Sequence, residues 1–537
     1  MYVCAAVSRQ FGVRQITISV MLPTVAERIE NGALVVVRCC RSSRNCFLLY
    51  STPKEDSPSC PTPFFLLGNF FQFFIGRLQG KSNVDMMGEW KDVYGPVYTV
   101  WLGPVPVVLV CDYKTATDVY VKNAAAHVGR PTTFVMQKPR EGLGIVFDDG
   151  PSWMEHRRFA LRTLRNFGLG RNIMQTLILE ETFHQFEALD AKIDQGGGRV
   201  TMDPTPLFDV LIASIINKLI AGYRYEEGDI EFASLKHNLD VMMEWITPLD
   251  QVLFNKYTYK LPFLRDRWSV LSRPQFAIID MMKRQIKDRQ ADIASGRRHI
   301  DVNDEGEDYI DAFLIEMKRR EESGADLEHF TENHLVANLI DLWVAGTETS
   351  ITTVLWSFIY LLNYPKVQEK MRSEMTQITQ GNRPVELTDK SQMPYTCAVI
   401  TECFRCSTAL NFNIFHQTTC ETQVGEWILP AGTITTPQVS VIATDKHEFV
   451  NPDQFDPERF IKNNDLEKHV IPFGIGKRSC LGEGLARAEL FLIVANSVQR
   501  YRISVPEGRE PPSMKQLSLK TMLKRTQFFE MTIERAD

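Results

Sequence analysis

The first 60 residues contain no uncharged run long enough to cross a lipid bilayer. The longest such run before Lys54 covers twelve residues, 15–26, whereas a membrane-spanning helix needs about 20. Arg9 and Arg14 precede every acidic residue, which is a weak indication of a mitochondrial presequence. We therefore expect residues 1–56 to be an N-terminal extension, and the sequence leaves open whether it acts as an anchor or as a targeting segment.

Residues 57–76 also carry no charge, but prolines and a glycine interrupt them. Pro61, Pro63 and Gly68 lie in or next to the apolar stretch FFLLGNFFQFF, and such breaks disfavour a lipid-exposed span. The pattern predicts a proline-bounded hinge followed by an apolar surface that faces a membrane. Packing in an ordinary hydrophobic core fits the same composition equally well.

Several other features are missing from the chain as a whole. No repeat of 20–50 residues is present, which disfavours a solenoid or a propeller. The net charge is only -6, from 60 basic and 66 acidic residues, so nothing indicates a nucleic-acid partner. The 11 cysteines are an odd and scattered set, which is a poor disulfide framework and suits a reducing compartment.

Helical patterns dominate what is there, and the fold class is expected to be mainly α with a small β region. The longest helix should begin at a Thr331 N-cap and stop before Pro365. At over 30 residues and apolar nearly all round in its middle, it should cross the core of a large domain. Short strands are expected near 97–102, 107–110 and 426–434.

A single cysteine lies among glycines and basic residues just before an apolar helical pattern, in PFGIGKRSCLGEG (472–484). A helix N-terminus and nearby cations lower the pKa of a thiol, and the thiolate is its metal-binding form. Gly476 and Gly482 would let the backbone approach a flat ligand and aim N–H groups at the sulfur. Such a Cys480 thiolate could be the axial ligand of haem iron, with Phe473 as a shield. An idle buried cysteine is the plain alternative.

This loop resembles the haem-binding loop of the cytochrome P-450 family at each defining position, which are Phe473, Gly476, Arg478, Cys480 and Gly482. The segment 345–349, AGTET, resembles the oxygen-activation segment of the family. There a loosening of the helix at Ala345 would leave room for a diatomic ligand. Glu348 and Thr349 would relay protons to reduced oxygen. Taken alone, a buried threonine in a helix is more often a packing residue.

Two more segments resemble the family. Glu402 and Arg405 share a helical face, and the resemblance implies that they form a buried network with Arg459 that is structural and not catalytic. Trp153 and Arg157, at i and i+4, would serve the haem propionates, which need cationic and hydrogen-bonding partners. The resemblance adds three residues to that set, namely Arg130, His416 and Arg478, with His416 resting on local likeness alone.

The resemblance runs from about Pro61 nearly to the C-terminus, so residues 57–537 are expected to form a haem domain with the cytochrome P-450 fold, a long central helix lying over haem b. The segments 159–171 and 394–411 resemble the microsomal animal enzymes that oxidise foreign compounds and lipids. Departures are the altered hinge at 52–63, Asn411 where a proline is usual, and no evident N-terminal anchor helix. A CxxC pair at residues 403–406 has no second pair nearby, which disfavours a zinc site.

The resemblance implies a haem-thiolate monooxygenase that inserts one atom of O2 into a lipophilic small molecule, which could be a xenobiotic, a fatty acid or a sterol. The implied electron donor is the NADPH-cytochrome P-450 reductase of the endoplasmic reticulum membrane, with cytochrome b5 as an optional second partner. A mitochondrial enzyme served by a ferredoxin is the alternative location. The implied docking surface is basic and comprises Arg157, Arg158, Arg162, Arg165, Arg171 and Lys477; a merely solvated helix face would look the same.

By resemblance, the substrate site is lined by residues of the segments 132–144, 242–254, 408–414 and 517–522 and of the long helix near Leu339, Val344 and Ala345. These segments contain the apolar side chains Phe134, Val135, Trp245, Phe254, Trp343 and Phe412. They suit a lipophilic molecule without naming one. Two other functions stay open at this point. One is a haem-thiolate isomerase or peroxide-driven enzyme that takes no electrons from a reductase, which the intact Glu348–Thr349 pair disfavours. The other is a non-catalytic haem-binding or ligand-binding protein.

Overall fold

The computed structural model describes residues 58–64, 67–131, 133–167, 172–410, 412–515 and 523–536, together with the backbone of two N-terminal strands. Those strands, β1 (Tyr2–Gln10) and β2 (Val13–Met21), pair antiparallel. Most of the N-terminal extension, part of the altered hinge, Asn411 and Arg171 lie outside the described residues, so the expectations that concern them stay predictions.

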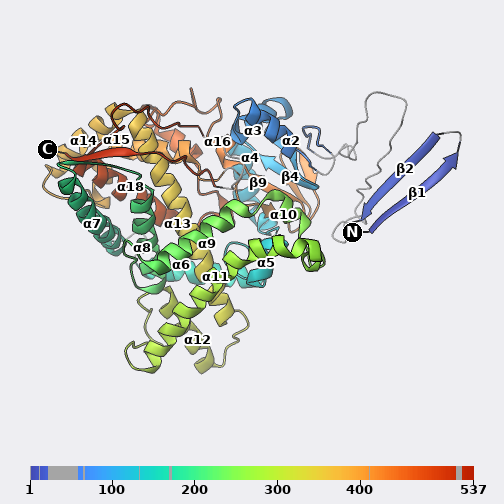
Figure 1. Ribbon diagram of the computed structural model, residues 1–537, viewed down its shortest axis with the longest axis horizontal. Coiled ribbons are helices and arrows are strands. Elements are labelled where there is room, and N and C mark those ends of the chain that lie inside the picture. Colours follow the sequence, from blue (N-terminus) through green and yellow to red (C-terminus); the bar gives the residue numbers. More distant parts are fainter. Residues whose placement is uncertain are drawn as a thin grey trace.

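Helices make up most of the described chain, in agreement with the mainly α fold predicted from the sequence (Figure 1). The α-helices are α2 (Phe70–Leu78), α3 (Asn83–Tyr94), α4 (Tyr113–Thr117), α5 (Phe134–Arg140), α6 (Gly150–Asn166), α7 (Asn172–Gln195), α8 (Thr205–Ala221), α9 (Ile230–Trp245), α10 (Pro248–Leu253), α11 (Pro262–Ala294), α12 (Tyr309–Ser323), α13 (Glu332–Asn363), α14 (Pro365–Thr379), α15 (Pro394–Ser407), α16 (Val439–Ile442), α17 (Glu458–Lys462) and α18 (Glu483–Arg500). Shorter helical turns are η1 (Asp118–Lys122), η2 (Ala124–His127), η3 (Thr258–Lys260), η4 (Leu387–Gln392), η5 (Asn464–His469) and η6 (Gly476–Arg478).

The β structure consists of small separate sheets. The largest has the order β3-β4-β9-β6, with β3 (Val97–Leu102) antiparallel to β4 (Val105–Val110), β4 parallel to β9 (Ile434–Pro437), and β9 antiparallel to β6 (His416–Gln417). A second sheet has the antiparallel order β10-β11-β5, from β10 (Tyr501–Ser504), β11 (Met531–Arg535) and β5 (Arg199–Met202). The strand expected at 426–434 is wrong as a single element, because Trp427–Leu429 (β8) turns back on Thr422–Val424 (β7) and β9 begins only at Ile434.

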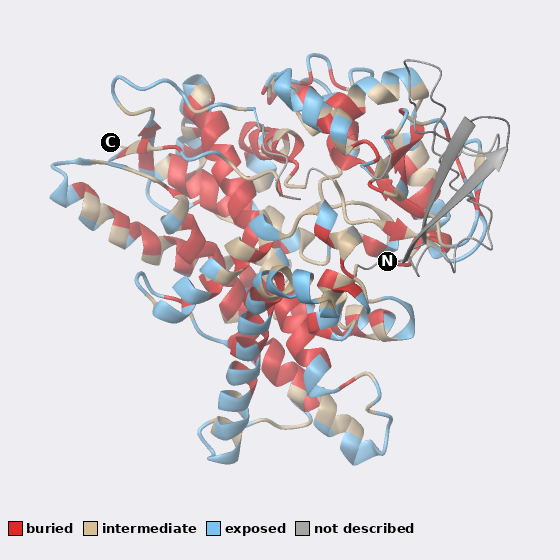
Figure 2. Cartoon of the chain, turned by 45° about the vertical axis from the view of Figure 1, so that its right-hand side comes forward, coloured by how far each residue is buried: buried red, intermediate tan, exposed pale blue. Residues whose placement is uncertain are grey.

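The long helix α13 runs through the middle of the helical part, as predicted (Figure 1). Thr331 occupies the N-cap with extended backbone, and its hydroxyl lies 2.8 Å from Nδ1 of His334 in the first turn. Pro365 begins α14 immediately after the C-cap of α13. Most of α13 is buried, and Figure 2 shows the buried residues concentrated in the middle of the molecule.

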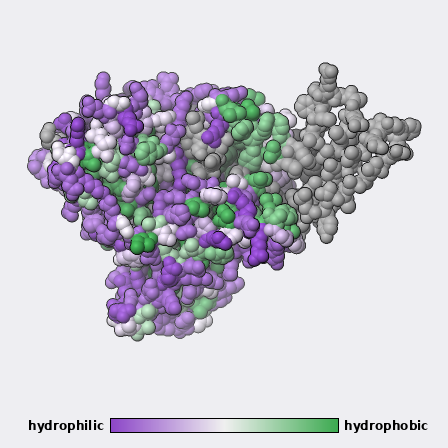
Figure 3. Space-filling model, viewed as in Figure 1, coloured by the Kyte–Doolittle hydropathy of each residue, from purple (hydrophilic) through white to green (hydrophobic). Residues whose placement is uncertain are grey.

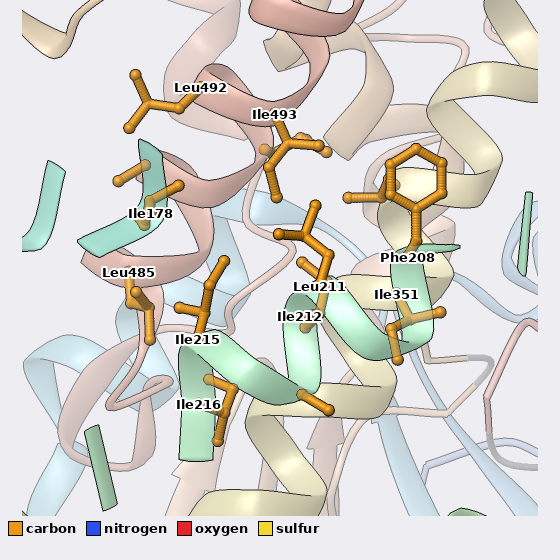
Figure 4. Packing of buried hydrophobic residues seen from close by; sticks show 14 of the residues in the cluster. Ile178, Phe208, Leu211, Ile212, Ile215, Ile216, Ile351, Leu485, Leu492 and Ile493 are labelled. Carbon is orange, nitrogen blue, oxygen red and sulfur yellow. The ribbon is translucent and has the colours of Figure 1, made fainter. Parts of the chain in front are cut away.

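The main hydrophobic core joins α13 to α7, α8 and α18. Figure 4 shows this packing for ten labelled side chains, which are Ile178, Phe208, Leu211, Ile212, Ile215, Ile216, Ile351, Leu485, Leu492 and Ile493. Each such side chain contributes roughly 1.5–3 kcal/mol when fully buried. Gly346 belongs to the same contact, since a Cβ there would lie 2.6 Å from Cδ1 of Ile216 on α8. The core therefore fixes α13 and the start of α18, the two elements that carry the predicted site.

The apolar segment 57–76 ends in a helix with one exposed face. Residues of α2 and the turn before it are exposed, namely Phe64, Leu67, Phe71, Phe74, Ile75 and Leu78. Phe73 and Gly76 are buried instead, with Gly76 against Met86 of α3. Figure 3 shows hydrophobic side chains gathered over this part of the surface. Within the described ranges, no helix has the length and hydrophobicity that crossing a membrane requires.

Candidate active site

The loop that carries Cys480 is held by its own backbone and by one close neighbour. The backbone N–H of Cys480 donates to the carbonyl of Phe473 at 2.9 Å. Gly476 has φ +83°, and a Cβ on it would lie 1.8 Å from the carbonyl oxygen of Tyr120. Only glycine fits there. Gly476 therefore packs closely against Tyr120, and its approach to a flat ligand stays a prediction. Gly482, the N-cap of α18, has open space where its Cβ would be.

The Cys480 side chain is accessible to solvent-sized molecules, although protein surrounds it closely enough for burial to raise the pKa of its thiol. The N–H of Gly482 and the charge of Arg157 act in the opposite direction, and Glu483 adds to the rise. The expected net lowering of the pKa of Cys480 is therefore wrong for the protein by itself. A metal cation would reverse it, since a coordinating thiol is deprotonated.

Four positively charged or ionisable side chains gather near this loop, as the sequence predicted. Arg478 lies with its guanidinium carbon 3.5 Å from the Trp153 ring centroid, and Arg157 donates from Nη2 to the Ser479 carbonyl at 2.6 Å. Arg130 donates to the carbonyl oxygens of Val146, Ile414 and Phe415 at 2.7–3.2 Å. His416 donates from Nδ1 to the His127 carbonyl at 2.8 Å.

The arginines of this set repel one another and disfavour a charge on His416, and the carbonyl oxygens do not neutralise them. Burial, with repulsion from Arg130 as the next cause, lowers the pKa of Arg478 to about 8. Burial and the charge of Arg157 lower the pKa of Arg130 to about 10. Burial, followed by repulsion from Arg130, lowers the pKa of His416 to about 3. An anionic ligand would relieve each of these shifts.

Two buried donors of this cluster have no hydrogen-bond partner, Nε1 of Trp153 and Nη1 of Arg478. Buried donors are almost always paired in proteins. Both belong to the residues predicted to bind the propionates of haem, whose carboxylates accept such hydrogen bonds. The residues present therefore fit haem. Across the described ranges, no group of three or more His, Cys, Asp or Glu side chains could hold a metal ion.

The predicted network behind the loop is confirmed. Arg405 binds Glu402 through two hydrogen bonds, from Nε at 2.7 Å and from Nη2 at 2.8 Å. Arg459 reaches the same carboxylate at 3.2 Å, and the backbone N–H of Asp456 donates to it at 2.8 Å. The remaining guanidinium donors bond to backbone carbonyls of Ala443, Val450 and Gln454. Glu402 and Arg405 are fully buried.

A family model described as cytochrome P450 matches residues 58–529. The chain belongs to the cytochrome P450 family. It is 32% identical over 475 residues to cytochrome P450 2J3 of Rattus norvegicus, a match that covers 88% of this chain and 89% of that protein. It is also 32% identical over 466 residues to cytochrome P450 2C5 of Oryctolagus cuniculus, with 85% and 91% covered. The probable cytochrome P450 cyp-35D1 of Caenorhabditis elegans is 32% identical over 454 residues, with 83% and 89% covered.

The resemblance found in the cysteine loop is thereby confirmed, and this cytochrome P450 is a haem-dependent monooxygenase with haem b as its cofactor. The roles of its individual site residues are not settled by membership. Cys480, Trp153, Arg157, Arg130, Arg478 and His416 lie together as the sequence predicted, and their functions stay predictions.

The middle of α13 presents two different faces in this cytochrome P450. Ala345 is exposed although most of the helix is buried, and the Thr349 hydroxyl, one turn later on the same face, donates to the Ala345 carbonyl at 2.6 Å. The helix shows no break in this segment, and Gly346 packs against α8, which corrects the expected loosening. Glu348 is buried on another face, where Lys236 and Arg525 bind its carboxylate.

Lys236 and Arg525 were not found from the sequence. They are 112 and 177 residues from Glu348, and no motif marks either of them. The same holds for the buried ion pair between Arg140 on α5 and Asp341 on α13, which lie 201 residues apart. Asp341 also accepts from the N–H of Val146 at 2.8 Å, so this pair fixes the loop after α5 against the central helix.

The six side chains named from the predicted substrate segments lie in different packing clusters or on the surface. Val135 and Phe254 are buried in one small cluster, against which Phe134 packs; Phe412 packs against another cluster. Trp343 is fully buried in the main core, and Trp245 is 48% exposed on the surface. The part of the substrate segment near Leu517–Met522 lies outside the described residues.

Proposed function

We propose that this cytochrome P450 oxidises a lipophilic small molecule, in the class of a xenobiotic, fatty acid or sterol, with electrons that pass from NADPH through a flavoprotein reductase. The observation that carries the proposal is the set of buried, unpaired donors on Trp153 and Arg478 beside the accessible Cys480 thiol. The names of the relatives support the enzyme class and leave the substrate open.

Each residue of the site has one task in this proposal. Cys480 binds the iron, with its sulfur steadied by the N–H of Gly482; Trp153, Arg157, Arg130, Arg478 and His416 bind the propionates. When bound, haem supplies the iron centre at which dioxygen is reduced and one oxygen atom passes to the substrate. Thr349 holds a proton at Oγ1 on the exposed face of α13. Ala345 leaves space on that face, and Glu348 is the candidate proton donor. Phe473 shields the cysteine loop, and its ring centroid lies 5.2 Å from that of Phe404.

The test compares the wild type with Cys480→Ser and a matched control, Cys420→Ser. Cys420 is also an exposed cysteine, but it lies outside the loop. The wild type and Cys420→Ser should give the carbon monoxide difference spectrum of a haem-thiolate protein and oxidise lipophilic compounds in the presence of NADPH and reductase. Cys480→Ser should lose both. An unchanged spectrum in Cys480→Ser would overturn the ligand assignment, and turnover without reductase would favour a peroxide-driven enzyme or an isomerase.

The reductase is proposed to dock on the exposed basic residues of α6 and the cysteine loop. Arg158, Arg165 and Lys477 are exposed. Arg162 is exposed but lies 3.3 Å from Glu316, and Arg157 bonds to Ser479 inside the loop, so Arg157 contributes less to docking than expected.

Arg158→Glu with Arg165→Glu should slow reduction by reductase at low salt, whereas Arg284→Glu on α11, an exposed control, should not. Equal rates in all three proteins would contradict this surface. Cytochrome b5 is proposed to use the same face.

We also propose that the exposed apolar face of α2 lies on the cytosolic side of the endoplasmic reticulum membrane, with residues 57–537 as the haem domain and residues 1–56 as an extension. Phe71, Phe74 and Leu78 supply the apolar area on that face. Phe74→Glu with Leu78→Glu should weaken binding of the purified protein to phospholipid vesicles. Fractionation of cells that express the tagged protein distinguishes this location from mitochondria.

A further inference from the structure

The Lys524 ammonium is surrounded by protein, and its hydrogen-bond partner carries no charge. Nζ donates to the carbonyl oxygen of Cys406 at 2.8 Å and lies 5.2 Å from the centroid of the Trp356 ring. Within the described ranges, no Asp or Glu side chain forms an ion pair with Lys524. Buried lysines are rare in proteins unless they are paired. This cation therefore has room for a counter-ion that the described chain does not supply.

The backbone around Lys524 joins two segments that the sequence predicted to line the substrate site. The N–H of Lys524 donates to the carbonyl of Ala409 at 2.7 Å, and Leu523 forms an antiparallel bridge with Leu410. Ala409 and Leu410 belong to the predicted segment 408–414, and the other predicted segment ends two residues before Lys524. Ala409, Leu410 and Lys524 are each half-buried. The cation thus lies where two predicted substrate segments meet.

The central helix α13 fixes the position of Lys524 relative to Thr349. Trp356 follows Thr349 by seven residues, which is about two helical turns, so both residues lie on the same face. At a rise of about 1.5 Å per residue, Trp356 lies about 10 Å further along the helix axis. Nε1 of Trp356 donates to the carbonyl oxygen of Lys524 at 2.5 Å. Lys524 is therefore attached to the face of α13 that carries Thr349, at a distance that a flexible hydrocarbon chain can span.

We propose that Lys524 is a specificity-determining residue that binds the carboxylate of a lipophilic acid. The carboxylate would supply the counter-ion that the Cys406 carbonyl does not, through charge-assisted hydrogen bonds that are stronger than neutral ones. The apolar chain of the acid would extend along α13 toward Thr349. The unpaired cation stands on the structure, whereas the use of the bound acid as a substrate rests on the proposed function.

The charges around Lys524 come from two helices. Burial lowers the pKa of its ammonium to about 8; Cys406 and Asp85 act to raise it, and Arg405 on α15 acts to lower it. The neighbour from α13, Trp356, carries no charge. Cys406 lies in the last turn of α15, where a cation is favourable. A lysine that served only to cap α15 would support acidic and neutral ligands equally, and this difference makes the two roles separable.

The first test measures binding of dodecanoate and of its methyl ester to the purified, haem-loaded full chain by calorimetry at about pH 7. Lys524→Met should bind dodecanoate about tenfold to hundredfold more weakly than the wild type, the usual effect of losing a hydrogen bond to a charged group. Its affinity for the ester should not change, and Lys524→Arg should recover most of the preference for the acid. Lys390→Met is the matched control and should bind both ligands as the wild type does. Lys390 is also half-buried, with its ammonium 4.8 Å from the centroid of the Phe491 ring.

Equal weakening of acid and ester in Lys524→Met would indicate a capping role and overturn the proposal. Wild-type affinity of Lys524→Met for dodecanoate would also overturn it. If Lys524→Met does not fold, the wild type makes the test by itself. Its affinity for dodecanoate should fall about tenfold between about pH 7 and about pH 9, as the ammonium loses its proton, while its affinity for the ester stays constant. An affinity for dodecanoate that does not change with pH would overturn the proposal.

Turnover separates this proposal from the proposed function. A wild type that prefers dodecanoate through Lys524 but oxidises no lipophilic compound with NADPH and reductase would refute the proposed function and leave the assignment of Lys524 intact. A wild type that oxidises neutral compounds but binds acid and ester with equal affinity, with no change in Lys524→Met, would do the reverse.

Discussion

Replacement of Glu402 by Gln tests the buried network behind the cysteine loop. The substitution keeps the shape of the side chain and removes its charge, so that the guanidinium groups of Arg405 and Arg459 lose the carboxylate that they share. Glu402 and Arg405 have no exposed side-chain area, and Arg459 is 6% exposed. Water therefore cannot replace the lost interaction, and two positive charges remain in the core.

The expected loss of unfolding free energy is about 3–5 kcal/mol, the usual result of removing one partner of a buried ion pair. Four hydrogen bonds end on the Glu402 carboxylate, three from guanidinium groups and one from the backbone of Asp456. Some of them persist as weaker bonds to the amide oxygen of Gln, so the total stays below the sum of four charged hydrogen bonds at about 1.5–3 kcal/mol each.

Urea unfolding followed by far-ultraviolet circular dichroism measures this loss. Glu458→Gln is the matched control, because Glu458 also pairs with a cation, Lys370, but both side chains are exposed by more than a third. Exposed pairs contribute about 0–1 kcal/mol, and the control should stay within that range. If Glu402→Gln lost no more than Glu458→Gln, the buried network would not stabilise the protein and the reasoning would be refuted.

Three further predictions follow from single positions. Gly476→Ala should abolish stable haem incorporation, because its Cβ would lie 1.8 Å from the carbonyl oxygen of Tyr120. Gly482→Ala is the control and should retain haem, because open space surrounds the position of its Cβ. The haem absorbance of the two purified proteins measures the difference. Burial raises the pKa of Asp209 to about 6 from 3.8, so the stability of the wild type should fall as the pH rises from about 4 to about 6. Above that range, Asp209→Asn should be more stable than the wild type by up to roughly 3 kcal/mol. Parallel pH profiles of the unfolding free energy of the two proteins would contradict this. Trp153→Phe should speed haem transfer to apomyoglobin several-fold, since it removes a buried donor, and an unchanged transfer rate would speak against a propionate contact.

Local sequence patterns predicted those parts of the site that are built from local geometry. The helix over 332–363 followed from its apolar pattern and its cap, and the Glu402–Arg405 pair followed from i, i+3 spacing. The Cys480 loop was found because several residue types must occur at fixed short distances in it. Each of these features depends on residues a few positions apart, where spacing and backbone geometry determine contact.

Contacts between distant segments could not be predicted in the same way. Nothing near Glu348 in sequence indicates that Lys236 and Arg525 would bind it, and nothing near Gly476 indicates the carbonyl of Tyr120. The same limit explains the substrate residues, since an apolar side chain such as Trp343 suits a binding site and a packed core equally well. Only the tertiary structure distinguishes these cases.

The partners of buried arginines distinguish a structural network from a ligand site in this enzyme. Arg405 and Arg459 both meet the carboxylate of Glu402. Arg130, Arg157 and Arg478 instead donate to carbonyl oxygens, which carry no net charge. Burial lowers the pKa of Arg130, Arg157 and Arg478, because removal from water disfavours their charged forms. Two propionate carboxylates would supply the missing negative charge, so binding of haem should raise these pKa values and stabilise the fold around the loop.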